Sequence, residues 1–476
     1  MATRRCDRDN STNPRLAWLW SVCAALVVAC VLQLGIQGHP YHNDERLWLK
    51  NAGKFYPKAF TERDMGNPIW WRWGGLDQPH LGRFLYGAVI TATGQGDQLP
   101  HLATMKRYRA RLGYEKNVER GAAPPAAILV PCRRTSAAMA AMACLMLLFI
   151  GASAFNWRVG LIACLWLGLS PLTWLVCRRA MTDGPLLLAL LAGMLFVVLM
   201  LKAALRDQLA RSLWWSLPAG LAVGVATSVK FNGAMAGLHA AGGCLLVAAA
   251  TVWVIVRARG GHTRTGTKPY GRRIVTVLAA GLIIGISSFA LFVAVNPTLY
   301  PGPIENIGKI LKQREETRAA IVTDKTRRRK ILENVAQRAT FIRDTLFIPD
   351  ARRGFGLLAQ STGWPLDIAL VLAGLAVVTW AEVRHICRTG TITAHSVVLL
   401  WVLITFGLMS VWLPIARFRY CLPMQAIVAL LCAAAIDPAM CRLVDAGRAR
   451  IARAREANAE FAQAQMLEGR AKDNSA

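Results

Sequence analysis

An acidic pair, Asp44 and Glu45, lies a few residues past a hydrophobic segment that covers about residues 16–36. A carboxylate at the edge of a membrane gains proton affinity when it loses part of its hydration. Such a group can accept a proton from a sugar or side-chain hydroxyl as a general base, while a neighbouring acid holds the acceptor. The two acids could instead cap the following helix on a solvated surface, so the pair alone leaves both interpretations open.

A third carboxylate, Asp183, stands in a very short loop between two hydrophobic segments, at residues 177–184. With the N-terminus on the inner side, this loop and the acidic pair lie at the same membrane face. Asp is also a favoured N-cap residue, and that role at the following helix is compatible with a place in a site. We therefore predict that Asp183 is a second acidic residue of a site at this face.

Cations occur in short loops at the same face, where the positive-inside rule disfavours them. They are Arg178, Arg179, Lys230, Arg417 and Arg419. Arginine forks and a lysine point charge are the usual partners of phosphate and pyrophosphate. Contact between long side chains and lipid head groups is the alternative for any one of them. Together they favour a site for a lipid-linked phosphate.

The elements that position these residues are membrane helices, because 54% of the 476 residues are hydrophobic and only 17% are charged. A span needs roughly 20 apolar residues, and on that rule we predict an all-α integral membrane protein with about 10 (9–12) transmembrane helices. The predicted spans are approximately residues 16–36, 137–155, 159–176, 184–201, 213–229, 234–256, 274–295, 365–381, 395–412 and 421–436.

The predicted organisation follows from these spans and from the distribution of Lys and Arg, which places the N-terminus and the basic C-terminal tail inside. Two long loops then lie outside. The first is expected to carry two helices on the membrane surface, and the second a charged helix over about residues 304–347. The predicted regions are 1–36 (N-terminus and first span), 37–136 (first outer loop), 137–295 (spans 2–7), 296–364 (second outer loop), 365–436 (C-terminal spans) and 437–476 (cytoplasmic tail).

Several other classes of site find no support in the sequence. The net charge of +29 is scattered among loops without a nucleic-acid-binding signature, so it indicates membrane topology and contact with anionic lipids. The twelve cysteines form no C-x-x-C pair. His39, His42 and His80 could join Asp44 around a metal, but their spacing fits no recognised ligand pattern. No Walker loop or H-E-x-x-H motif is present, and we predict no cofactor.

Six short motifs, in this order along the chain, resemble the C-type (GT-C) polyprenyl-phosphate-dependent membrane glycosyltransferases. The resemblance is to the protein O-mannosyltransferases of glycosyltransferase family 39 and to the bacterial lipid A aminoarabinose transferases. The motifs are NDE at 43–45, DQPHLG at 77–82, RAMTDGPL at 179–186, SVKFNG at 228–233, NPTLYP at 296–301 and RYCLP at 419–423. Relatives often show His-Pro-Pro where this chain has DQPH, which leaves the acceptor open.

The resemblance implies a GT-C-like fold and transfer of a sugar, with inversion, from a polyprenyl-phosphate donor to an acceptor hydroxyl. It implies Asp44 as the general base, Glu45 as its partner at the acceptor and Asp183 as a further acidic residue. Lys230, Arg179, Arg417 and Arg419 would bind the donor phosphate, and His80, Asn232 and Tyr420 would contact substrate. The implied place is a bacterial inner membrane, with the site facing the periplasm or exterior.

Two readings from other classes remain open on the sequence alone. A carrier or flippase for an anionic lipid-linked substrate would need polar groups near the bilayer midplane, where the predicted spans are nearly free of charge. A non-catalytic scaffold would explain the long outer loops but not the acids at helix ends. The sugar and the acceptor, whether protein, lipid or glycan, are not specified by the sequence.

Overall fold

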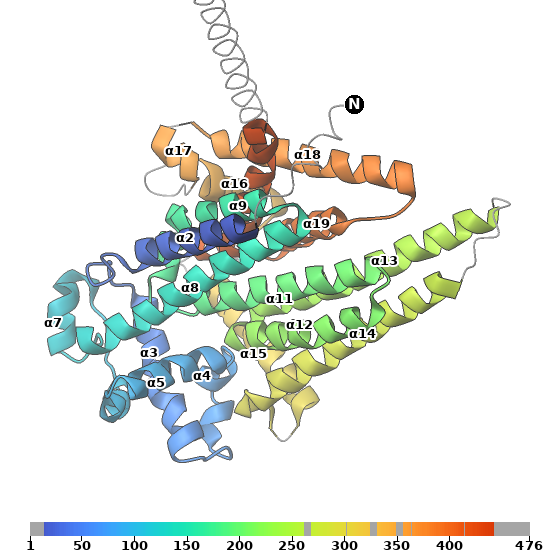
Figure 1. Ribbon diagram of the computed structural model, residues 1–476. Coiled ribbons are helices and arrows are strands. Elements are labelled where there is room, and N and C mark those ends of the chain that lie inside the picture. The colour runs from blue at the N-terminus through green and yellow to red at the C-terminus, as the bar shows by residue number, and fades with distance from the viewer. Residues whose placement is uncertain are drawn as a thin grey trace, which may run out of the picture.

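The computed structural model describes residues 14–260, 268–300, 302–323, 331–348, 356–362, 364–413 and 415–441. Within these ranges the chain is helical and contains no β-strand, apart from an isolated antiparallel bridge between Ile331 and Ile415. Figure 1 shows long helices that lie side by side in a bundle, with shorter helices gathered at one end of it. The prediction of an all-α membrane protein is confirmed.

Eight described helices are long and apolar enough to cross a membrane, or nine when one bent pair is counted as a span. The bent pair is α9 (Trp157–Leu169) and α10 (Pro171–Cys177), which meet at 57°. The helix α2 (Pro14–Gln33) coincides with the first predicted span, although its described apolar part is shorter than the others. The eight are α8 (Ala126–Ala154), α11 (Asp183–Leu205), α12 (Leu209–Val229), α13 (Met235–Gly260), α14 (Lys268–Ala294), α18 (Leu366–Thr389), α19 (Ala394–Trp412) and the unlabelled helix Phe418–Cys441.

The centre of the bundle is α11, which is apolar on all sides and packs against α8 and α12. The helix α12 in turn packs against α14, and the backbones of the two helices lie very close together. A Cβ on Gly220 would lie 2.9 Å from the Cα of Ile284, so only glycine permits this approach. Lipid tails are as apolar as these side chains, and close packing of this kind therefore stabilises the helix pair.

The segment between α2 and α8 contains more helices than predicted. It holds α3 (Asn43–Tyr56), a π-helix (Pro57–Thr61), a 3-10 turn (Pro68–Trp71), α4 (Trp73–Leu76), α5 (Leu81–Ala92), α6 (Leu99–Ala103) and α7 (Gly113–Glu119), with short 3-10 turns at Gly96–Gln98 and Ala110–Leu112. In addition, α8 begins at Ala126, well before the predicted start of the span at residue 137. The charges of Arg133 and Arg134 interrupt the apolar run there and hide the first turns of this helix.

The segment before α18 also differs from the prediction of one charged helix. It contains α15 (Pro303–Thr323), α16 (Val335–Phe347) and α17 (Leu357–Thr362), after a 3-10 turn at Pro297–Leu299. Residues 324–330 between α15 and α16 lie outside the described ranges, as do residues 442–476, which belong to the predicted cytoplasmic tail. Within the described ranges, α15 packs against α4 and against the turn that precedes it.

A buried ion pair fixes α3 to the bundle. Both Glu45 and Arg133 of α8 are almost fully buried, at 0% and 2% exposure. The guanidinium donates to both carboxylate oxygens, with Nε–Oε1 at 2.7 Å and Nη2–Oε2 at 2.8 Å. The carboxylate also accepts from the backbone N–H groups of His42 and Ala180, both at 2.9 Å. One side chain thereby joins the start of α3 to α8 and to the loop before α11.

We expect Glu45→Gln to destabilise the protein strongly, because it leaves the Arg133 charge buried without its counter-charge. The expected cost is about 3–5 kcal/mol of the free energy of unfolding, and the double variant Glu45→Leu/Arg133→Met should recover much of it. Chemical denaturation in mixed micelles measures both. The matched control is Glu62→Gln in the exposed pair of Lys58 and Glu62, for which we expect about 0–1 kcal/mol. Equal losses in Glu45→Gln and the control would contradict this role of the buried pair.

Candidate active site

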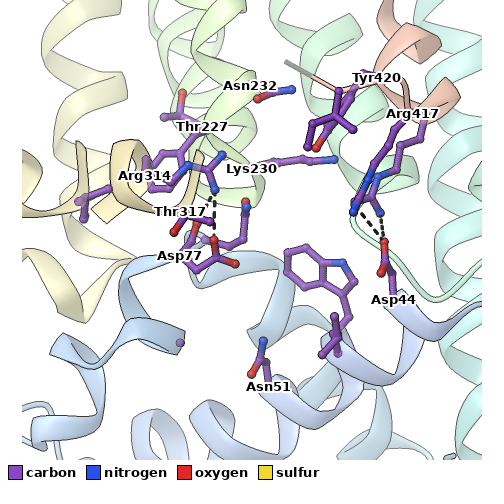
Figure 2. Close-up of a pocket in the computed structure, with 18 of the residues that line it drawn as sticks. Asp44, Asn51, Asp77, Thr227, Lys230, Asn232, Arg314, Thr317, Arg417 and Tyr420 are labelled. Carbon is purple, nitrogen blue, oxygen red and sulfur yellow. Dashed lines mark hydrogen bonds and ion pairs between the residues drawn. The ribbon is translucent and has the colours of Figure 1, made fainter. Parts of the chain in front are cut away.

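A cavity of about 1210 Å³ lies beside α3, at the end of the bundle where the shorter helices gather. Its walls come from α3, α15, the turn after α12 and the segment that follows α19 (Figure 2). Its polar lining includes Asn43, Asp44, Arg46, Lys50, Asn51, Lys54, Asp77, Gln78, Thr227, Lys230, Asn232, Arg314, Glu315, Thr317, Arg417, Arg419 and Tyr420.

Asp44 lies against two arginines at one side of this cavity, and Figure 2 shows it beside Arg417. The Arg419 Nη1 donates to Asp44 Oδ2 at 2.6 Å, and Arg417 Nη1 lies 3.7 Å from the same oxygen. Asp44 occupies the first turn of α3, where His42 and Glu45 form a capping box. The carboxylate is thus held by the start of one helix and by a segment 375 residues further along the chain.

The electrostatics of Asp44 differ from the sequence-based expectation. Burial favours the protonated acid, as expected, but the charges of Arg419, His42 and Arg417 and the Arg419 hydrogen bond outweigh it. The pKa of Asp44 is therefore held below its ordinary value. The expectation of a raised proton affinity was wrong for the site as it stands, because it took no account of the arginines that the fold brings to this carboxylate.

Lys230 and Asp183 form a second ion pair at the same end of the bundle, with Nζ–Oδ1 at 2.9 Å. Both residues, with Asn232, Arg419 and Tyr420, also line a small cavity of about 10 Å³. Asp183 is the first residue of α11, whereas its N-cap is Thr182, so the expected capping role was misplaced by one residue.

The turn after α12 places Lys230 and Asn232 at the cavity. It folds back so tightly that a Cβ on Gly233 would lie 2.1 Å from the carbonyl carbon of Ala226. The Lys230 ammonium lies 5.4 Å from the centre of the Tyr420 ring. The structure therefore brings Asp44, Lys230, Asn232, Arg417, Arg419 and Tyr420 to one cavity.

Four predicted site residues do not line this cavity, namely Asp183, which lines only the small one, and Glu45, His80 and Arg179. The carboxylate of Glu45 is fully engaged by Arg133 and by two backbone N–H groups, so it is not available at the acceptor. The side chain of His80 is fully buried among Phe55, Trp70 and Phe84, with its Nδ1 3.2 Å from Arg83. Its backbone N–H donates to Asn296 at 2.8 Å. We therefore correct the expected contact of His80 with substrate, because this side chain is a core residue.

Arg178 and Arg179 also lie away from the large cavity. Arg179 is 8% exposed, and its Nε has no hydrogen-bond partner. Burial, opposed by the charge of Glu45, lowers its pKa. The Arg178 guanidinium stacks 4.1 Å from the Trp174 ring and donates to the Leu34 carbonyl. Neither arginine lines the cavity, so the expected contact between Arg179 and the donor phosphate does not follow from this geometry.

Sequence reasoning missed a pair that bridges the opposite wall. Arg314 of α15 donates from Nη1 to the Asp77 carbonyl at 2.7 Å and to its Oδ1 at 3.4 Å (Figure 2). The guanidinium also lies 5.3 Å from the centre of the ring of Phe231, the residue that follows Lys230 in the sequence. Asp77 belongs to a motif singled out in the sequence, but Arg314 is one of many charges in its helix and carried no distinguishing signal.

The lining of the cavity carries an excess of positive charge. Seven cationic side chains line it, at Arg46, Lys50, Lys54, Lys230, Arg314, Arg417 and Arg419, against the three carboxylates Asp44, Asp77 and Glu315. Among the described residues, no group of three or more His, Cys, Asp or Glu side chains is arranged to hold a metal ion. The cavity is accordingly suited to a ligand that bears more than one negative charge.

Comparison with known proteins identifies the fold. No protein-family model matches the chain, and no curated protein sequence matches it. The archaeal oligosaccharyltransferase AglB from Archaeoglobus fulgidus, solved with an inhibitory peptide and a dolichol-phosphate, matches with a TM-score of 0.50 at 11% identity. That match covers 91% of this chain and 51% of AglB.

Two further solved structures match with lower TM-scores. They are ArnT from Cupriavidus metallidurans bound to undecaprenyl phosphate (TM-score 0.48, 14% identity, 88% of this chain and 60% of ArnT) and the S. cerevisiae protein O-mannosyltransferase Pmt1-Pmt2 complex bound to the sugar donor (0.39, 18%, 59% and 33%). This chain spans about half the length of AglB. The AglB match and the described spans identify this chain as a multi-pass membrane protein with a GT-C-like fold.

We expect Arg419→Gln to raise the pKa of Asp44, because the variant removes the strongest attraction on the carboxylate and leaves burial to favour the acid. The expected change is a rise, because Arg419 is the largest of the charges that lower this pKa. Isotope-edited infrared titration of the aspartate carboxyls measures it, and Asp44→Asn assigns the band. A titration of Asp44 that is the same in Arg419→Gln and in the unaltered protein would show that Arg419 does not set this pKa.

Proposed function

We propose that this protein is a membrane glycosyltransferase that moves a sugar from a polyprenyl-phosphate carrier to an acceptor hydroxyl, with inversion. The observation that carries the proposal is the meeting of Asp44 with Lys230, Arg417 and Arg419 in one cavity at the ends of membrane spans. Further support comes from the fold shared with AglB, whose structure contains a dolichol-phosphate. We place the cavity at the extracytoplasmic face of a bacterial plasma membrane, as the positive-inside rule favours.

In the proposed reaction the oxygen of the acceptor hydroxyl attacks the anomeric carbon of the donor sugar. The bond between that carbon and the phosphate oxygen breaks, and the polyprenyl phosphate leaves with the bonding electron pair. The carboxylate of Asp44 takes the hydroxyl proton. Lys230, Arg417 and Arg419 stabilise the negative charge that develops on the leaving phosphate.

The arginines also give a reason why a carboxylate with a lowered pKa can serve as the base. Before the donor binds, Arg417 and Arg419 are directed at Asp44. The donor phosphate is a diester with one negative charge, so it competes with the carboxylate for the same guanidinium N–H groups, and the attraction grows as the leaving phosphate gains a second charge. When the arginines turn to the phosphate, Asp44 loses its closest attraction and its proton affinity rises. Donor binding would in this way prepare the base for the acceptor.

The other predicted residues act, in this proposal, through their neighbours. Asp183 positions the Lys230 ammonium, with which it shares a buried ion pair. Glu45 positions Asp44, because it anchors the first turn of α3. Asn232 and Tyr420 line the cavity beside Lys230 and are in place to contact the donor sugar or phosphate. The apolar part of the lining, with Phe292, Ile310, Leu311, Met409 and Leu413, would accept the first isoprene units of the carrier.

We expect Asp44→Asn to lower sugar transfer by about 10²–10⁴-fold, because the amide cannot accept the hydroxyl proton. The assay follows label from a panel of radiolabelled polyprenyl-phosphate sugars into acceptors of native membranes, with purified protein in lipid. Asp97→Asn is the matched control, since Asp97 is an exposed acid in the same region of the chain and does not line the cavity. Full transfer by Asp44→Asn, or no transfer from any donor by the unaltered protein, would favour the carrier or scaffold reading instead.

A further inference from the structure

A second group of cations lines the cavity on one edge of α3. Arg46, Lys50 and Lys54 follow one another at intervals of four residues, so their side chains lie in a row along the helix. At 1.5 Å per residue the row is about 12 Å long. Asp44 and Asn51 lie on the other edge of the face that α3 presents to the cavity, and Figure 2 shows both on that helix. The row therefore begins about half a turn after the proposed base and runs along the other edge of the same helix.

No carboxylate compensates these three charges among the residues that the structure describes, since none of them takes part in an ion pair there. Arg46 donates to the Lys106 carbonyl at 2.7 Å and to Asn43 Oδ1 at 3.1 Å, which leaves other guanidinium N–H groups for a ligand. Lys50 donates to the Met105 carbonyl at 2.7 Å and keeps two further donors. The backbone carbonyls orient these side chains but do not neutralise them.

The three cations also repel one another. The pKa of Lys50 is lowered from its ordinary value by burial, then by the charges of Arg46 and Lys54. Holding like charges together in a partly buried row costs free energy, and a bound anion would remove that cost. The row thus has the properties of a binding surface rather than of a set of solvated charges.

The row is separate from the cations that serve the proposed donor phosphate. Lys230 comes from the turn after α12, and Arg417 and Arg419 come from the segment after α19, whereas the row belongs to α3 alone. An acceptor whose hydroxyl reaches Asp44 on the first turn of α3 would extend along the same helix. Its remaining groups would then face Arg46, Lys50 and Lys54.

We infer that Arg46, Lys50 and Lys54 form an acceptor subsite, and that the acceptor is a polyanion bearing phosphate groups near the hydroxyl that receives the sugar. This inference rests on the proposed function, because it assigns the row to the acceptor of that reaction. It makes a neutral polypeptide or neutral glycan a poor acceptor, since neither would offset the three positive charges.

The test measures binding rather than transfer, with the full chain in phosphatidylcholine nanodiscs. The probe is a short glycerol phosphate oligomer carrying an uncharged dye, compared with the same glycerol oligomer without phosphate. The variant is Arg46→Gln/Lys50→Gln/Lys54→Gln, whose glutamines favour the helix and keep a hydrogen-bond donor. The control, Lys309→Gln/Lys312→Gln/Arg343→Gln, removes the same charge from exposed cations of α15 and α16 outside the cavity.

We expect the row variant to bind the phosphate oligomer at least about tenfold more weakly than the unaltered protein, with the control unchanged. Binding of undecaprenyl phosphate should be unchanged in the row variant. Lys54→Glu is a second variant for use if the triple variant does not fold. Within the described ranges Lys54 makes no hydrogen bond that this variant would break, and the variant should weaken oligomer binding in the same direction.

Four results would overturn the inference. They are equal oligomer binding by the row variant and the unaltered protein, an equal loss in the control, equally tight binding of the neutral oligomer, or loss of undecaprenyl phosphate binding in the row variant. The last result would assign the row to the donor. Because binding is read without sugar transfer, failure of this inference is distinguishable from failure of the proposed glycosyltransferase activity.

Discussion

The candidate site depends on the buried ion pair of Glu45 and Arg133. Charges in a low-dielectric interior are costly unless their partners are fixed, and here the carboxylate is satisfied by a guanidinium and two backbone N–H groups. This requirement ties the first turn of α3, the helix α8 and the loop before α11 to one another. Asp44 is the neighbour of Glu45 in sequence, so its position in the cavity follows from an interaction in which it takes no part.

Two carboxylates side by side in the chain thereby acquire opposite environments. The helical step of about 100° turns Glu45 into the core and Asp44 toward the cavity. Glu45 has a permanent partner, whereas Asp44 has partners that a phosphate can take from it. The same contrast holds for the cations, since Lys230 has the buried partner Asp183, whereas Arg417 and Arg419 face Asp44 in the cavity. Buried ion pairs thus lie beside the contacts of Asp44 at one end of the bundle.

Hydrophobic runs predicted the helical bundle, because span length and composition are local properties of the chain. Each predicted span contains a helix, and the cations that violate the positive-inside rule include three that line the cavity. The partners of the site residues could not be predicted, because they come from distant parts of the chain. His80 is held by Asn296 and Asp77 by Arg314, more than two hundred residues away in each case. Likewise, the lowered pKa of Asp44 follows from Arg419, whose distance from it in space no local pattern encodes.

The contact between Asp44 and Arg419 has a consequence for biogenesis. The two residues are separated by 375 positions, and the second belongs to the start of the last described span. At a synthesis rate of about 5–20 residues per second, Arg419 leaves the ribosome roughly 20–75 s after Asp44. During that interval the nascent chain holds the acid without its counter-charges. The site is completed only when the final described helix is inserted, so an interrupted chain would carry the acid without the arginines that face it.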